Sequence, residues 1–489
     1  MSEARPHAVV VVGCGSSGAS AVWHLLAAGV RDVVVLEQGD VGLGASGGVA
    51  VAAHASLREG DLDADAAGGR FRHALASGTA VMERASCIKM SIGVYPCSSA
   101  AFVAEHGAEG ARRYLRLARQ GLLLQRELGA AVLPDPATQL QQLGSLYVCK
   151  DRAEDIAELW AEFCALRELG YEGCGWWGDA QRVRAAAGGE WARAIWFADD
   201  CVVNSTAYAA GLLDAARRRA PGALAVRTRC SPVVAVETVR GRARTKLASG
   251  EELWSEHVVL AAGGLFVDRA LAGVLRPAWS YLVGITEPAA RQPGPLGGAF
   301  RFASAYSPNF FSWGFTHDWC LSGGVLRCSG EDHHSALKPP RAEERCEALA
   351  EWTAQQYPYL RPSKASCERR YGVYSETPDH SPVVGSTRPD SRVCYLQVSV
   401  RLHTRRARPT YSFADSLSSS LSLSARAGLQ CLGAGLAFVR CLARAGAART
   451  RGADARAARF AQGPHGATLC ALARAGQALS LLSLPVSIE

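Results

Sequence analysis

Three glycines near the start of the chain have the spacing of a phosphate-binding turn. Gly13, Gly15 and Gly18 form the pattern G-x-G-x-x-G, with Ser16 and Ser17 inside it. The first glycine permits a tight turn, the second lets the backbone approach a pyrophosphate, and the third lets the next helix pack closely on its strand. Backbone N–H groups and the positive dipole end at that helix N-terminus bind anions. We therefore predict that these five residues contact the pyrophosphate of a dinucleotide.

An acidic residue stands where a dinucleotide-binding site requires one. Glu37 follows the glycines by about 20 residues, the position at which a carboxylate binds the ribose hydroxyls. A 2′-phosphate would call for an arginine, so glutamate favours FAD or NAD over NADP. We predict that Glu37 and its neighbour Gln38 contact the cofactor. A β-α-β unit that binds no ligand is the alternative.

The hydrophobic pattern predicts the elements that position these residues. Four consecutive valines, Val9 to Val12, are typical of a strand buried on both faces. A helix of small and apolar residues then covers Ala19 to Ala28 and ends at Gly29, and a second strand covers Asp32 to Leu36. This order of strand, turn, helix and strand brings the helix N-terminus and Glu37 to one end of a parallel sheet.

A second loop of small residues follows Glu37. Gly44, Ala45, Ser46 and Gly47 form a G-A-S-G segment whose backbone can lie against the same pyrophosphate and the flavin edge. The glycine pattern, Glu37 and this segment together resemble the FAD-dependent D-amino-acid oxidase-like superfamily, which includes sarcosine and glycine oxidases. The resemblance implies FAD as the cofactor and these four residues as contacts. A flexible surface loop is the alternative for the segment alone.

Three later segments occur in the order that the resembled superfamily has. Residues 231–237 are similar to a strand that meets the adenine through its backbone. An apolar strand at 257–261 runs into a small-residue segment where the backbone approaches the dinucleotide again. Residues 377–385 contain the string T-P-D-x-x-P-V-V-G, which resembles the return of the chain to the flavin domain. The resemblance thus implies further cofactor contacts from Val233, Ala262, Gly263 and Gly264.

We predict an α/β fold with a Rossmann-like FAD-binding domain and a second α+β substrate domain built on an antiparallel sheet. Segments between 276 and 330 alternate with a period of two and are rich in aromatic residues, which predicts the strands of that sheet. The sheet would cover the flavin. A strong helix begins near residue 207, with Ser205 or Thr206 as its cap. The discontinuous FAD-binding domain covers 1–95, 196–274 and 366–400, with about 428–460, and the substrate domain covers 96–195 and 275–365.

Oxidation of an amine by a flavin needs few protein side chains. The flavin accepts the hydride, while the protein orients a neutral amine and excludes competitors. The carboxylate of an amino-acid substrate requires a cation, best a bidentate arginine. Arg327 on a predicted roof strand is the first candidate, with Tyr281 and Tyr374 as hydroxyl donors. A surface position for Arg327 and a core position for either tyrosine are the alternatives.

Two features bear on covalent attachment and metals. Some relatives attach their flavin through a cysteine just ahead of the Y-x-x-T-P-D string, and Gly372 occupies the matching position here. The resemblance therefore implies non-covalent FAD. Asp332, His333 and His334 are adjacent on a predicted loop, where neighbouring side chains rarely converge, and no other cluster completes a site. We predict no metal.

The charge distribution argues against nucleic acid as a partner. The net charge of +8 comes from the region after residue 400, where 12 arginines and no lysine stand against three acidic residues. The preceding part has 41 basic and 42 acidic residues. A flavin-dependent tRNA-modifying relative remains an alternative, but its phosphate contacts would demand a basic surface that this body lacks.

The composition also predicts the compartment. No apolar run reaches 18 residues and the N-terminus lacks the features of a signal peptide, so we expect a cytoplasmic protein without a membrane span. The 16 cysteines include no C-x-x-C pair and are typical of reduced thiols in a long chain without an export signal. The expected partner is a small amine or amino-acid substrate, and the oligomeric state stays open.

The resemblance ends near residue 397. Residues 401–427 form an atypical Arg- and Ser-rich low-complexity insertion where the superfamily has a glycine-rich loop that dips to the flavin ring. Gly433 and Gly435 are candidates for a displaced loop, and 461–489 form a tail. A disordered insertion and an erroneous gene model carrying translated noncoding sequence are two explanations that the sequence leaves open.

The preferred function is that of a FAD-dependent oxidoreductase. It would oxidise a small amine, amino acid or N-alkyl amino acid by hydride transfer to the flavin. The alternative is a FAD-binding pseudoenzyme whose C-terminal flavin loop is impaired.

Overall fold

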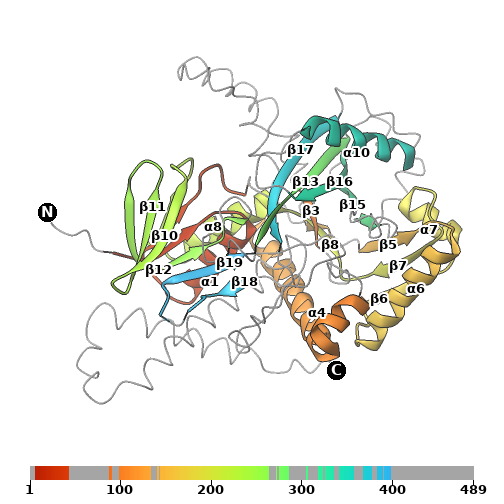
Figure 1. Ribbon diagram of the computed structural model, residues 1–489, viewed down its shortest axis with the longest axis horizontal. Coiled ribbons are helices and arrows are strands. Elements are labelled where there is room, and N and C mark those ends of the chain that lie inside the picture. Colours follow the sequence, from red (N-terminus) through yellow and green to blue (C-terminus); the bar gives the residue numbers. More distant parts are fainter. Residues whose placement is uncertain are drawn as a thin grey trace.

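The computed structural model describes the two lobes of the chain that contain its sheets (Figure 1). The predicted α/β class is confirmed, with a parallel-rich sheet in one lobe and a largely antiparallel sheet in the other. The described residues are 6–42, 87–90, 99–133, 140–141, 144–263, 271, 275–285, 304–306, 318–322, 325–334, 341–356, 367–376, 383–388 and 390–397. Of the predicted cofactor contacts, Gly44, Ala45, Ser46, Gly47 and Gly264 lie outside them, as do residues 401–489.

The first sheet is built around β1 (His7–Val12). Val9 to Val12 are buried, as expected for a strand covered on both faces. β1 pairs in parallel with β2 (Val33–Leu36) on one side and with β12 (Glu252–Leu260) on the other. The remaining strands of this sheet are β9 (Leu224–Arg227), β10 (Val233–Val239), β11 (Arg242–Leu247), β18 (Val383–Gly385) and β19 (Val393–Gln397).

Helices cover the first sheet through one apolar core. α1 (Ser16–Ala27) follows β1 and packs against α8 (Ser205–Arg219), and α8 also contacts α4 (Ser99–Val132). The cap of α8 differs from the prediction, because Asn204 rather than Ser205 or Thr206 precedes the helix. The Asn204 side chain accepts a hydrogen bond from the backbone N–H of Ala207 at 3.1 Å.

The second sheet runs in the order β17-β13-β16-β15-β14-β5-β7-β6. α10 (Ala342–Gln356) packs against β13, β16 and β17, while α6 (Ala153–Glu168) and α7 (Ala180–Ala187) lie at the other end. The strands are β5 (Ser145–Cys149), β6 (Cys174–Trp177), β7 (Arg193–Phe197), β13 (Arg276–Ile285), β14 (Ser304–Tyr306), β15 (Asp318–Ser322), β16 (Val325–His334) and β17 (Cys367–Glu376).

The chain passes between the two sheets in the T-P-D segment. β17 pairs with β13 in the second sheet, whereas β18 belongs to the first, so the change of sheet occurs between Glu376 and Val383. The predicted domain boundary at residue 366 lies ahead of this point. A third, small sheet joins β3 (Cys87–Met90), β4 (Leu140–Gln141) and β8 (Cys201–Asn204).

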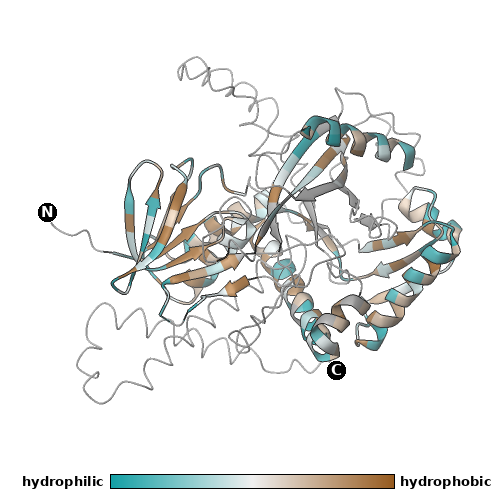
Figure 2. Cartoon of the chain, in the orientation of Figure 1, coloured by the Kyte–Doolittle hydropathy of each residue, from teal (hydrophilic) through white to brown (hydrophobic). Residues whose placement is uncertain are grey.

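The hydropathy of the elements agrees with this layering. Figure 2 shows hydrophobic residues on the central strands of the first sheet and hydrophilic residues along the outer side of α10. Within the described ranges, none of the helices has the length and apolar character needed to cross a membrane. Nine cysteines of those ranges are free thiols, namely Cys14, Cys149, Cys164, Cys174, Cys201, Cys230, Cys328, Cys346 and Cys394.

Candidate functional site

The turn between β1 and α1 has no room for side chains at two of its glycines. Gly13 has φ +93°, and a Cβ added there would lie 2.6 Å from the carbonyl oxygen of Ala261. A Cβ on Gly18 would overlap the carbonyl oxygen of Gly13. Both requirements follow from close packing of the turn against the end of β12 and against its own helix.

The N-terminus of α1 is arranged to receive an anion. Gly15 is its N-cap, no side chain caps its first turn, and no acidic residue lies in that turn. Ser16 and Ser17 are the first two helical residues. The backbone N–H groups at such a terminus and the positive end of the helix dipole suit a pyrophosphate, so this part of the chain fits the diphosphate of a dinucleotide.

Glu37 is fixed at the carboxyl end of β2 by two backbone donors. Its Oε2 accepts a hydrogen bond from the N–H of Cys14 at 2.7 Å, and its Oε1 accepts one from the N–H of Gly39 at 2.8 Å. Glu37 is half-buried and Gln38 is exposed. Burial and the charge of Glu37 raise the pKa of the Cys14 thiol to about 12, which keeps this cysteine protonated and unreactive.

The segment leading into β10 is bound to the residues around Glu37. The N–H of Arg229 donates to the carbonyl of Gly39, and the N–H of Cys230 donates to the carbonyl of Glu37. The Arg229 guanidinium also forms a bidentate pair with Asp40, at 2.8 and 3.0 Å. These contacts bring the chain just ahead of Val233, the first residue of β10, next to Glu37, the residue predicted to bind the ribose.

The end of β12 lies beside the glycine turn. The N–H of Ala261 donates to the carbonyl of Val12 at 2.8 Å, so Ala262 and Gly263 leave the sheet next to the glycine turn. Gly263 has φ +59°, a conformation that favours glycine. The carboxyl ends of β1, β2 and β12 therefore meet where the strand order changes direction, the usual ligand position in such sheets.

A family model described as FAD dependent oxidoreductase matches residues 8–398. The chain belongs to this family. The predicted D-amino-acid oxidase-like relationship, the FAD cofactor and the enzyme class are thereby confirmed. No curated protein sequence matches the chain.

Solved structures show the same fold for this FAD-dependent oxidoreductase. Glycine oxidase from Geobacillus kaustophilus has a TM-score of 0.61 at 15% identity, covering 90% of this chain and 95% of its own. Fructosamine oxidase from Aspergillus fumigatus has a TM-score of 0.59 at 12% identity, covering 89% and 86%. L-Proline dehydrogenase from P. horikoshii has a TM-score of 0.53 at 13% identity, covering 80% and 87%.

The candidate substrate residues are not equivalent in the structure. Tyr281 is fully buried between the second sheet and α10, with its ring centroid 6.0 Å from that of Tyr371. The guanidinium of Arg345 on α10 lies 5.7 Å from the Tyr281 ring. Tyr281 thus occupies the core position that the sequence left as an alternative. The backbone of Arg327 pairs with Gly284, and that of Tyr374 pairs with Ala278.

The segment predicted to be a loop at 332–334 is part of a strand. β16 extends to His334, where it pairs with Ala278 of β13. Pairing with β13 therefore overrides the loop that the polar residues predicted. In the part of the chain that the structure describes, no group of three His, Cys, Asp or Glu residues could hold a metal.

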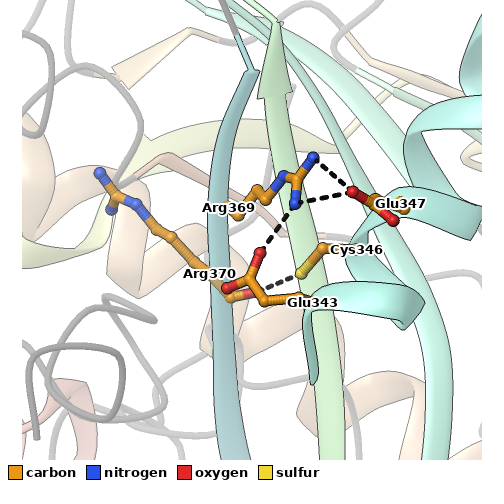
Figure 3. Close-up of polar contacts among 5 residues, drawn as sticks. All are labelled: Glu343, Cys346, Glu347, Arg369 and Arg370. Atoms are coloured by element: carbon orange, nitrogen blue, oxygen red, sulfur yellow. Dashed lines mark hydrogen bonds and ion pairs between the residues drawn. The ribbon is translucent and has the colours of Figure 1, made fainter. Parts of the chain in front are cut away.

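One arginine that the sequence analysis did not single out is buried in β17. Arg370 is 2% exposed, and its carbonyl accepts a hydrogen bond from the Cys346 thiol at 3.8 Å. Its neighbour Arg369 instead pairs with Glu343 at 2.8 Å and Glu347 at 3.4 Å on α10 (Figure 3). Successive side chains of a strand point to opposite faces of the sheet, so Arg369 and Arg370 face opposite ways. This alternation is the sequence pattern that could have singled out Arg370.

Proposed function

We propose that this FAD-dependent oxidoreductase oxidises a small amine, amino acid or N-alkyl amino acid, releasing two electrons and a proton as a hydride to the flavin. The observation that carries the proposal is the family match over residues 8–398, combined with a glycine turn and Glu37 that fit FAD. The similar structures are named as a glycine oxidase, a fructosamine oxidase and an L-proline dehydrogenase, so each relative is named for an amine or amino-acid substrate.

The residues of this chain have distinct tasks in such a reaction. The N-terminus of α1 would hold the diphosphate and Glu37 would hold the ribose, which fixes the cofactor along its length. Bound FAD supplies the two-electron acceptor. The protein must then orient the C–H bond of a neutral amine and keep water from the reacting atoms. We place these tasks on the second sheet, and propose non-covalent FAD because Gly372 offers no thiol.

The proposal is tested by a substrate screen on the full-length protein. The purified protein is saturated with FAD, freed of oxygen and mixed with single amines, amino acids and N-methyl amino acids. Loss of the visible flavin absorbance with at least one compound is the expected result. A protein that binds FAD but is reduced by none of these compounds, although dithionite reduces it, would contradict the proposal.

A second candidate is a FAD-binding protein without turnover. The family match ends at residue 398, just ahead of the Arg- and Ser-rich segment 401–427. The superfamily's glycine-rich flavin loop is expected in this region. Under this candidate the same screen gives bound but unreduced flavin. Peptide mapping of the native protein across 402–423 would then establish whether that segment is translated.

A further inference from the structure

We propose that residues 99–106, the first part of α4, form a strap that swings about Gly107 and closes against α6 through a contact between Ser99 and Glu162. These eight residues are called the strap below, and the contact is called the clasp. The strap is a conformational device of the fold and does not depend on which substrate the enzyme oxidises.

A non-helical residue separates the strap from the rest of α4. Gly107 has φ +71° and ψ 164°, a backbone conformation that is essentially restricted to glycine. A regular helix cannot continue through such a residue, so the strap and residues 108–132 are two helical segments joined at one point. A Cβ added at Gly107 would meet no atom within 4 Å, so the hinge has open space beside it.

The N-terminal end of the strap is held by Glu162 of α6. The backbone N–H of Ser99 donates to Oε2 of Glu162 at 2.8 Å, and the Ser99 hydroxyl donates to Oε1 at 2.6 Å. Both residues are buried. The first N–H groups of a helix have no partner within that helix, so the carboxylate caps α4 from a neighbouring element. The clasp therefore breaks when the strap moves away from α6.

Phe102 packs the strap against the second segment of α4. Its ring centroid lies 4.8 Å from that of Tyr114, beyond the hinge, and 4.3 Å from that of His106, within the strap. Phe102 and Tyr114 are both buried. Movement of the strap about Gly107 would expose Phe102, so the burial of apolar surface favours the closed position. The clasp adds a contribution that depends on the charge of Glu162.

Protonation of Glu162 favours the closed position. Burial raises the pKa of Glu162 to about 7; the hydrogen bonds from Ser99 oppose this rise, and the charge of Glu158 on α6 adds to it. In the described part of the chain, the Cys174 thiol of β6 also faces Glu162, and burial raises its pKa to about 11, so this thiol stays neutral.

The pH dependence of the strap follows from the two pKa values of Glu162. Opening returns the carboxyl to water, where its pKa is the ordinary 4.5. The closed position therefore retains a proton that the open position releases. Its advantage is full below pH 4.5 and is lost as the pH rises through 7, so the strap opens more often at alkaline pH.

The test is hydrogen exchange of the FAD-saturated full-length protein, measured by mass spectrometry at pH 6 and pH 8. Protection factors, which correct for the intrinsic exchange rate, are compared for residues 100–106 and 115–125. The protection of the strap should fall by about tenfold between the two pH values, the change that the two pKa values of Glu162 imply. Residues 115–125 should keep their protection.

Three variants separate the clasp from the hinge. In Glu162→Gln the amide does not titrate, so the protection of the strap should be the same at both pH values. Glu168→Gln, at the exposed end of α6, should retain the wild-type difference. Gly107→Ala should lower the protection of the strap at both pH values, because alanine rarely adopts the conformation that the closed hinge requires.

Two results for the wild type would overturn the inference. One is a strap whose protection is the same at pH 6 and pH 8. The other is an equal fall in residues 115–125, which would mean that α4 opens as a whole. If Glu162→Gln does not fold, Ser99→Ala decides, because it removes the hydroxyl donor of the clasp. Strap protection lowered by about threefold or more at pH 6 in that variant supports the clasp, and unchanged protection refutes it.

Discussion

Glu37 Oε2 accepts a hydrogen bond from the backbone N–H of Cys14 at 2.7 Å, which ties the carboxylate predicted to bind the ribose directly to the turn predicted to bind the phosphates. The two residues come from the ends of neighbouring strands, and Oε1 of the same carboxylate is held by the N–H of Gly39. The carboxylate is therefore oriented before any ligand arrives. A pre-oriented group loses less entropy on binding than a mobile one.

Replacement of Glu37 should weaken FAD binding. In Glu37→Gln, the two backbone donors lose a charged acceptor and the ribose hydroxyls lose theirs. We expect the Kd for FAD to rise by about tenfold or more, since hydrogen bonds to charged groups contribute about 1.5–3 kcal/mol. The quenching of FAD fluorescence on titration with apoprotein measures this value. An unchanged Kd would show that the ribose is held elsewhere.

Gly18 should tolerate no side chain. In Gly18→Ala the new Cβ overlaps the carbonyl oxygen of Gly13, so the turn must move away from the pyrophosphate position. We expect the purified variant to lack the yellow colour of bound flavin. Gly175→Ala is the matched control, because its Cβ would meet only Trp196 at an ordinary 3.9 Å. A Gly18→Ala protein with full FAD content would refute the packing argument.

A buried carboxyl should make stability depend on pH. Glu162 on α6 accepts hydrogen bonds from the N–H and hydroxyl of Ser99, the first residue of α4, at 2.8 and 2.6 Å. Burial raises the pKa of Glu162 to about 7, against the opposing effect of Ser99. A folded pKa above the ordinary 4.5 means that the contribution is full below pH 4.5 and is lost as the pH rises through 7. The loss amounts to about 3 kcal/mol.

Denaturant unfolding at pH 5 and pH 8 checks this effect. The free energy of unfolding should fall less between the two values in Glu162→Gln than in the wild type, because the amide does not titrate. Glu168→Gln, at the exposed end of the same helix, should retain the wild-type difference. Equal differences in Glu162→Gln and the wild type would mean that Glu162 keeps an ordinary pKa.

The cap of α8 should contribute measurably to stability. Asn204→Ala removes the side chain that accepts from Ala207, and we expect a loss of about 1 kcal/mol. Thr206→Ala is the control, since Thr206 does not cap the helix. Thermal unfolding of the two variants should therefore give a lower midpoint only for Asn204→Ala. A lower midpoint only for Thr206→Ala would instead mean that Thr206 caps the helix, as the sequence predicted.

Local patterns predicted the strand, turn, helix and strand around the glycines correctly. The four valines, the glycine spacing and Glu37 lie within one β-α-β unit, so short-range pattern determines their arrangement. The cap of α8 was misplaced because Asn204, Ser205 and Thr206 are all good N-caps and follow one another. Pattern alone does not choose among them.

The arrangement of the second sheet depended on contacts between distant segments. Alternation alone shows that Arg369 and Arg370 face opposite ways, but only the packing of α10 shows which of them enters an ion pair. Likewise, the sequence does not distinguish a core position for Tyr281 from a substrate contact, and only the packing of α10 shows that this tyrosine is buried. Residues 332–334 belong to a strand because β16 pairs with β13, and no local sequence pattern predicted this pairing.

The measurement that tests the account most directly is anaerobic reduction of the FAD-saturated full-length protein by amino acids, with the carbonyl product counted. Reduction by an amino acid or N-methyl amino acid should bleach the flavin and yield one carbonyl compound per flavin reduced. Flavin that stays oxidised with every amine, in a protein that binds FAD fully, would contradict the claim that this family member oxidises amines.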